Sequence, residues 1–110
     1  MAKKKIDNLQ GSLELLILKT LERAPNHGFG ITAHVSAASE GLLEIEEGSL
    51  YPALHRFERD KLIMGSWKVT ENGRRARFYA LTPSGRKRLA EARDNWRTVS
   101  RGVKKLLKFA

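Results

Sequence analysis

The 110-residue sequence contains no cysteine, which excludes disulfide bonds and thiolate chemistry. Long apolar runs are also missing, because the longest aliphatic stretch covers only residues 15–18 and is too short to span a bilayer. The basic N-terminal segment MAKKKIDNLQG has no apolar stretch of signal-peptide length. We therefore expect a cytoplasmic protein that does not span a membrane.

The sequence also lacks the common catalytic and metal-binding motifs. It has no GxSxG or Walker motif and no paired carboxylates in an apolar setting. Its three histidines, His27, His34 and His55, are too scattered to predict a metal site. These absences argue against an enzyme, and we expect no cofactor.

Acidic residues are few compared with basic ones. Asp and Glu number 12, against 21 Lys and Arg, which gives a formal net charge of +9. The positive excess is concentrated in residues 83–110, whereas residues 40–62 are net acidic. This balance favours a polyanionic partner such as nucleic acid, with a merely solvated basic surface as the alternative.

Residues 12–24, SLELLILKTLERA, have the apolar spacing of a helix whose cap is Ser12 or Asn8. Leu15 and Leu18 fall outside its main apolar face, so the helix has to be covered on more than one side. That main face consists of Leu13, Leu16, Ile17, Thr20 and Leu21.

A second helix is predicted after the break at Pro25 and Gly28, with Asn26 as its cap. Ile31 and Val35 are its expected apolar residues. The triplet LEI at residues 43–45 is interpreted as a short strand before the next helix.

The most informative stretch is EEGSLYPALHRFERDKL, at residues 46–62. Leu50, Leu54 and Phe57 recur at i, i+4 and i+7 and predict one buried stripe of a helix. Pro52 fits this helix only in the first turn, and a helix beginning at Glu46 should be kinked by it. At about 100° per residue, the solvent side carries Ser49, Tyr51, Pro52, His55, Arg56 and Arg59.

Residues 63–70 and 76–82 alternate in polarity and predict two strands of a hairpin. Asn72 and Gly73 between them favour a type I′ turn, which needs a positive φ at both residues. Arg74 and Arg75 would then lie at or beside the tip. We expect Trp67 to belong to the hydrophobic core of this hairpin, with a functional stacking platform as the alternative. Thr82 and Pro83 should begin a last helix.

Three helices followed by a hairpin with a basic tip predict a winged helix-turn-helix, mainly α with a small β-hairpin. In such folds the second helix of the pair lies in the major groove, where Ser, Tyr, His and Arg side chains and the apolar edge of a Pro suit the base edges. The predicted DNA-binding residues are Ser49, Tyr51, Pro52, His55 and Arg56 on this helix. At the hairpin tip they are Asn72, Gly73, Arg74 and Arg75.

Some of these residues have other interpretations. The Tyr51 hydroxyl would reach a phosphate or, failing that, Tyr51 would pack against the hairpin, and Arg59 would contact DNA or pair with Glu58 or Asp60. Glu44, Glu46 and Glu47 count against a purely electrostatic footprint unless they complement the helix N-terminus or pair with a nearby Arg. A winged-helix module for protein–protein assembly is the alternative function.

The last helix, residues 83–109, has an apolar repeat of 3.5, which is typical of a coiled-coil seam. At about 1.5 Å per residue it is longer than a domain of this size can cover, so we expect a homodimer with Trp96 as a central anchor. A monomer with a partly frayed helix is the alternative, and a flat aromatic effector stacking on Trp96 between subunits is a further interpretation. The predicted interface residues are Leu15, Leu18, Leu89, Ala92, Trp96, Val99, Val103 and Leu106.

The sequence resembles the PadR-like transcriptional regulators over roughly residues 9–96. The matching stretches are LQGSLELLILKTL, HGFGI, EEGSLYPALHRFERDKLI and, after a Trp, ENGRRARFYALTPSGRKRL, with a second Trp about ten residues on.

The resemblance implies a homodimeric repressor of a roughly palindromic operator. Residues 47–56 would open its recognition helix, residues 72–75 would form the wing tip, and the C-terminal helix would dimerise. Residues 1–82 would then be the DNA-binding domain and residues 83–110 the dimerisation helix. Lys61 departs from a position where the family commonly has Gly.

Overall fold

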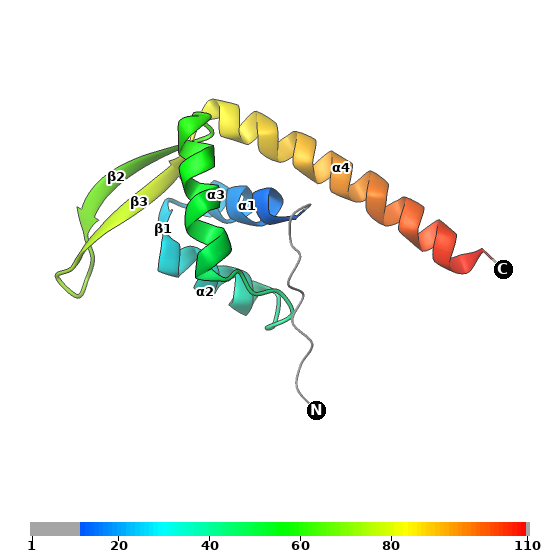
Figure 1. The fold of residues 1–110 in the computed structure, drawn as a ribbon, viewed down its shortest axis with the longest axis horizontal. Helices are drawn as coiled ribbons and strands as arrows, with labels where there is room; N and C mark the ends of the chain where they lie inside the picture. Colours follow the sequence, from blue (N-terminus) through cyan, green and yellow to red (C-terminus); the bar gives the residue numbers. More distant parts are fainter. Residues whose placement is uncertain (1–11, 110) are drawn as a thin grey trace.

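The computed structural model describes residues 12–109, so Asn8 and Ala110 lie outside the described part. Four helices and a three-stranded antiparallel sheet confirm the predicted winged helix-turn-helix with a long C-terminal helix (Figure 1). In chain order the elements are α1 (Leu13–Arg23), β1 (Asn26–His27), α2 (Gly28–Ala38), α3 (Glu47–Arg59), β2 (Ile63–Val69), β3 (Arg75–Leu81) and α4 (Pro83–Lys108).

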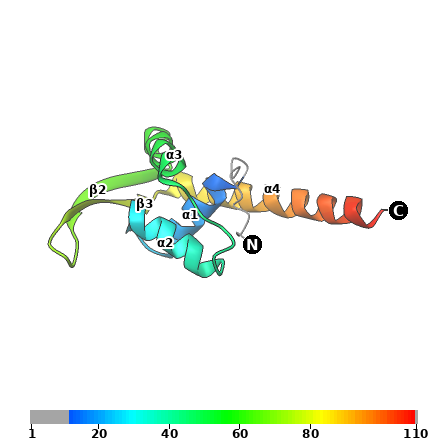
Figure 2. The same cartoon turned by 60° about the horizontal axis from the view of Figure 1, so that its bottom comes forward.

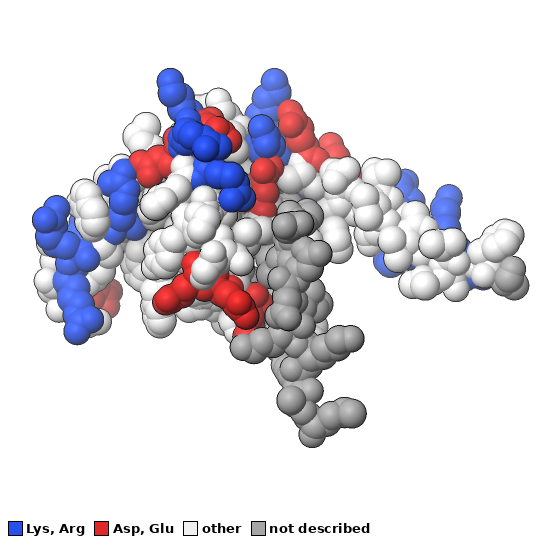
Figure 3. Space-filling view, viewed as in Figure 1, with Lys and Arg blue, Asp and Glu red and all other residues white. Residues whose placement is uncertain are grey.

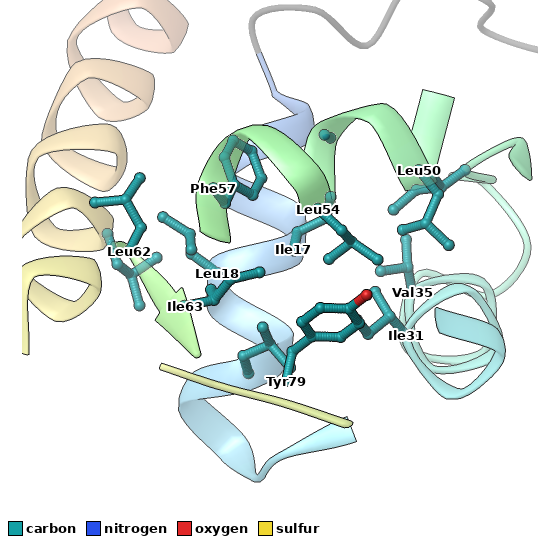
Figure 4. Packing of buried hydrophobic residues seen from close by; sticks show 14 residues of the cluster. Ile17, Leu18, Ile31, Val35, Leu50, Leu54, Phe57, Leu62, Ile63 and Tyr79 are labelled. Atoms are coloured by element: carbon teal, nitrogen blue, oxygen red, sulfur yellow. The ribbon is translucent and has the colours of Figure 1, made fainter. Parts of the chain in front are cut away.

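The core lies where α1, α2 and α3 meet the base of the sheet. The predicted stripe of α3 is confirmed, because Leu50, Leu54 and Phe57 are all buried. Figure 4 shows these side chains pointing toward Ile17 of α1 and Ile31 of α2. Burying one such Leu or Ile side chain contributes about 1.5–3 kcal/mol to the free energy of unfolding.

Leu18 was expected at a dimer interface, and this expectation is wrong. Its side chain is 0% exposed and belongs to the core of the single chain. The reason is that α1 is covered on several sides, by α2, by β3 and by the first part of α4. Leu15 is only partly buried and remains available to a partner.

The segment before α3 differs from the prediction in two places. Residues 43–45 form no strand; Ile45 is buried and Leu43 partly buried because both pack on the core from a loop. The cap of α2 is His27, whose Nδ1 accepts a hydrogen bond from the Gly30 amide at 3.0 Å. Asn26 instead forms β1, which pairs with Tyr79 of β3.

Pro52 lies inside α3, in the second turn, so the condition that the sequence set for it, a place in the first turn, is not met. It therefore provides no N–H to the Gly48 carbonyl four residues earlier. Both residues are exposed, so water can satisfy that carbonyl. The position of Pro52 on the solvent side is what makes it tolerable there.

The hairpin of β2 and β3 is confirmed, with a register that runs from Ile63↔Leu81 to Val69↔Arg75. Its turn is not type I′, since only Gly73 has a positive φ, of 77°. The Gly73 amide donates to the Thr70 carbonyl at 2.9 Å, and the Thr70 amide donates to the Arg74 carbonyl at 2.7 Å. This is a three-residue loop that ends in a left-handed glycine, the next most common hairpin connection.

The last helix begins as predicted, with Thr82 as cap and Pro83 at its first position. Its first part packs on α1, where Arg88 pairs with Glu14 at 3.4 Å and Arg93 pairs with Glu22 at 3.5 Å. Leu89, expected in the dimer seam, is 1% exposed and belongs to this intramolecular contact. The second part of α4 projects beyond the other helices (Figures 1 and 2).

Candidate nucleic-acid interface

The solvent side of α3 presents the side chains that the sequence predicted for reading DNA. Ser49, Tyr51, Pro52, His55 and Arg56 are all exposed, opposite the buried stripe of the same helix. Arg56 lies with its guanidinium over the Phe57 ring, 5.6 Å from the centroid. One face of one helix therefore carries two hydroxyl groups, an imidazole and a guanidinium that are accessible to a ligand.

Charge is distributed unevenly along α3. Figure 3 shows acidic side chains gathered at its N-terminal end and basic ones at its C-terminal end and along the hairpin. Glu47 lies in the first turn, where a carboxylate complements the partial positive charge of the helix N-terminus. Arg59 Nε lies 3.4 Å from Asp60 Oδ1, one of the two acidic neighbours with which the sequence suggested that it could pair.

The hairpin tip presents the predicted wing residues. Asn72, Gly73, Arg74 and Arg75 are all exposed, and the tip projects away from the helical core (Figures 1 and 2). Two guanidinium groups from successive residues directly after a projecting turn are suited to phosphate oxygens or to the narrow minor groove.

Trp67 was expected in the core of the hairpin, and this expectation is wrong. Its side chain is 58% exposed, because none of the elements within residues 12–109 covers the hairpin beyond its base; Met64 and Val69 are similarly exposed. The guanidinium groups of Arg75 and Arg77 lie over its ring at 5.2 and 5.7 Å. Trp67 is thus an exposed aromatic ring between two cations, beside the predicted wing residues.

A cleft of about 480 Å³ separates α3 from the hairpin and reaches the start of α2. Tyr51 and His55 line it from α3, and Trp67 and Arg75 from the hairpin. The Tyr51 ring also contacts α2, where a Cβ added at Gly28 would lie 2.9 Å from the Tyr51 hydroxyl. His27 and Phe29 line the cleft as well, and neither was predicted as a site residue. Their only sequence signal is the HGFGI stretch, which has no residue type specific for DNA.

An ion pair between Glu58 of α3 and Arg77 of β3 joins the helix to the hairpin next to this cleft. The hydrogen bond to Glu58 raises the pKa of Arg77. Tyr79 of β3 is buried behind the pair, and this burial raises the pKa of its hydroxyl. Arg77 could not be predicted as a site residue, because a strand residue and a helix residue 19 positions apart carry no pairing signal in the sequence.

A second exposed surface lies on α4, away from the hairpin. Trp96, Val99, Val103 and Leu106 are each 47% exposed or more, whereas Ala92 is partly buried. A mainly apolar cleft of about 340 Å³ opens between α1 and α2, and Leu15, Leu16 and Leu43 are among its lining residues. Both surfaces are suited to contact with another chain.

Within residues 12–109, no group of His, Asp and Glu side chains is arranged to hold a metal ion. None of the helices in this part of the chain combines the length and the apolar character needed to cross a bilayer.

The chain is similar to known transcriptional regulators in sequence and in structure. A transcriptional regulator of Mycobacterium tuberculosis is 36% identical over 77 residues, which cover 70% of this chain and 68% of that protein. The structure of a PadR-like transcriptional regulator from Bacillus cereus matches with a TM-score of 0.78 and 30% identity, over 93% of this chain and 97% of that one. A transcriptional regulator from Clostridium thermocellum matches with a TM-score of 0.83 and 25% identity, over 91% and 97% of the two chains.

The family model of the PadR-like transcriptional regulators matches residues 17–91, from the core of α1 to the first part of α4. This span contains the whole of α3, the cleft and the wing. The chain therefore belongs to the PadR-like family of transcriptional regulators.

Proposed function

We propose that the protein is a sequence-specific DNA-binding repressor that acts as a homodimer on a roughly palindromic operator. The observation that carries this proposal is the combined exposure of the α3 reading face and the basic wing on either side of one cleft. If α3 lies in the major groove and the wing lies at the adjacent backbone or minor groove, the DNA backbone between them would pass over that cleft.

The roles of the residues follow from their chemistry. Arg56 and His55 would donate to base edges, with Ser49 and the apolar edge of Pro52 beside them. Tyr51, which faces the cleft, would donate to the phosphate backbone. The wing tip would contact the backbone or minor groove through Asn72, Gly73, Arg74 and Arg75.

The dimer in this proposal is formed by α4. Residues 1–82 would be the DNA-binding domain and residues 83–110 the dimerisation helix. Trp96, Val99, Val103 and Leu106 would pack on the partner near Leu15, with Ala92 at the edge of the contact. The Trp96 ring is also where a flat aromatic effector would stack between subunits.

The salt dependence of duplex binding tests the proposal. If the wing holds phosphates, the logarithm of the binding constant falls steeply with the logarithm of salt concentration, by about 0.9 per phosphate contact. Replacing Arg74 and Arg75 together with Ala should weaken binding to every duplex and reduce the slope by about one unit for each lost contact.

The matched control is the double replacement of Lys104 and Lys105 by Ala, which removes the same charge from the remote part of α4. Its slope should stay close to that of the original protein. A slope that the wing variant leaves unchanged would contradict the role of the wing. Binding that is weak and insensitive to salt in the original protein would favour the protein–protein assembly module.

A further inference from the structure

Arg77 of β3 belongs to the hairpin whose tip is the wing. Its side chain contacts Glu58 of α3 and Trp67 of β2. Its Nη2 donates to Glu58 Oε2 of α3, and the two side chains are 32% and 30% exposed. A pair that is two-thirds shielded from water is held more firmly than a pair on the open surface. It ties the C-terminal half of α3 to the strand that leads back from the wing tip.

Gly65 of β2 provides the space that Arg77 needs for this contact. A Cβ added at Gly65 would lie 2.6 Å from Arg77 Nε and 2.7 Å from Nη2. These distances are shorter than any normal van der Waals contact, so the Arg77 side chain lies directly across the backbone of β2. Any other residue at position 65 would displace the guanidinium from its place beside Glu58.

Trp67 extends this contact toward the wing tip. It is the cross-strand neighbour of Arg77, whose guanidinium lies 5.7 Å from the ring centroid. The Arg75 guanidinium lies over the same ring at 5.2 Å. Each cation–π contact of this kind is modestly favourable. Here the two contacts link Arg77 to Arg75, which is next to the wing tip, through the Trp67 ring.

The hairpin depends on such contacts for its orientation. Beyond its base, no element in the described part of the chain covers it, and Met64 and Val69 are 67% and 69% exposed. A two-stranded ribbon that projects into water is marginally stable and twists easily. The angle between wing and α3 is therefore controlled where side chains link the ribbon to the helix.

We propose that Arg77 is a positioning residue for DNA recognition, which fixes the wing against α3 through Glu58 and presents Arg75 through Trp67. This inference rests on the proposed function, because it assigns the wing to DNA. A wing that is already ordered loses less conformational entropy on binding, so the ion pair raises affinity without touching DNA.

Replacing Glu58 with Gln distinguishes the positioning role from a purely electrostatic effect on DNA binding. The two predict changes of opposite sign in DNA affinity. The variant loses a negative charge, so electrostatics alone would tighten DNA binding slightly. If Glu58 holds Arg77 in place, binding should instead weaken about three- to tenfold, the cost of ordering one or two side chains anew on binding. The matched control is Asp60→Asn, which makes the same charge change at the end of the same helix and should bind as well as the original protein or better.

A second variant, Gly65→Ala, changes no charge at all. The three atoms nearest to the added Cβ all belong to the flexible Arg77 side chain, so the variant should weaken DNA binding to a similar extent as Glu58→Gln. Thermal unfolding of both variants is the measurement that tests whether the fold is retained. If the alanine variant does not fold, the Glu58→Gln result stands alone.

Acrylamide quenching of Trp67 fluorescence tests the contact without DNA, in a Trp96→Phe background that leaves Trp67 as the single tryptophan. Quenching should rise in both Glu58→Gln and Gly65→Ala, because Arg77 no longer covers one side of the ring. Unchanged quenching in the glutamine variant, or DNA binding in that variant as tight as in Asp60→Asn, would overturn the inference. Failure of the original protein to bind duplex DNA would instead contradict the proposed function and leave the quenching result to decide whether Arg77 orders the wing.

Discussion

Lys61 has a backbone conformation that favours glycine. Its φ is 61°, in the left-handed region, directly after the last turn of α3. The Leu62 amide donates to the Phe57 carbonyl at 2.9 Å and the Lys61 amide donates to the Glu58 carbonyl at 3.0 Å. These two hydrogen bonds form a Schellman motif, so the turn is made even though Lys stands where the family commonly has Gly.

We expect Lys61→Gly to raise the free energy of unfolding by about 1 kcal/mol, because glycine adopts this conformation without the steric cost that a Cβ carries. Chemical denaturation measures the change. The control is Lys87→Gly, at an exposed site inside α4, which should lower the free energy of unfolding by a similar amount. If Lys61→Gly instead lowers the free energy of unfolding by as much as Lys87→Gly does, the conformation at position 61 costs nothing.

At the scale of elements, we expect α3 to separate residues that read DNA bases from residues that do not. Arg56 and Arg59 are both exposed, and Arg59 pairs with Asp60. Replacing Arg56 with Ala should weaken binding to the specific operator by about 1–3 kcal/mol while binding to random duplexes changes little. The measurement is a competition between operator and random DNA.

Arg59→Ala is the control for this experiment, since it removes the same charge from the same helix. It should weaken binding to both kinds of DNA by the same small amount. If Arg56→Ala also lowers affinity for operator and random duplexes equally, Arg56 only holds the phosphate backbone and the sequence is read elsewhere.

The elements that could be predicted from the sequence are those with a repeated local signal. The apolar spacing of Leu50, Leu54 and Phe57 and the turn residues Asn72 and Gly73 each identify their element from neighbouring residues alone. By contrast, the sequence does not show β1, because two residues are too few for an alternating pattern. The strand expected at residues 43–45 does not form, because apolar residues in a loop can pack on a core without hydrogen bonding to another strand.

The errors at individual residues arose where burial depends on contacts distant in sequence. Leu18 is buried because β3 and α4 return to cover α1. Trp67 is exposed because no other element that the structure describes covers the outer part of the hairpin. The apolar character of a residue indicates only that its burial would be favourable, and not whether another element covers it. The candidate site was predictable on α3 and at the wing tip, whereas the Glu58–Arg77 contact that links the two required the structure.

At the scale of the whole molecule, α4 extends beyond the body that the other elements form. It has 26 residues, which corresponds to about 39 Å at 1.5 Å per residue. The exposed side chains of Trp96, Val99 and Val103 recur along its projecting part on one side. An exposed apolar stripe of this kind is typical of a protein–protein interface, which is why we propose that a second copy covers it.

Trp96→Asp should convert the proposed dimer into a folded monomer, because a carboxylate in the centre of an apolar contact loses its hydration without gaining a partner. The monomer should lose specific operator binding, since two half-sites about one helical turn apart are read together only by a linked pair. The control is Thr98→Asp, which places the same charge about 200° around the helix from Trp96, on the side away from the stripe. Sedimentation gives the mass of each variant and a gel-shift assay its operator affinity. A Trp96→Asp protein that remains dimeric and binds the operator as tightly as Thr98→Asp would place the dimer contact on another surface, and the apolar stripe of α4 would then need a different partner.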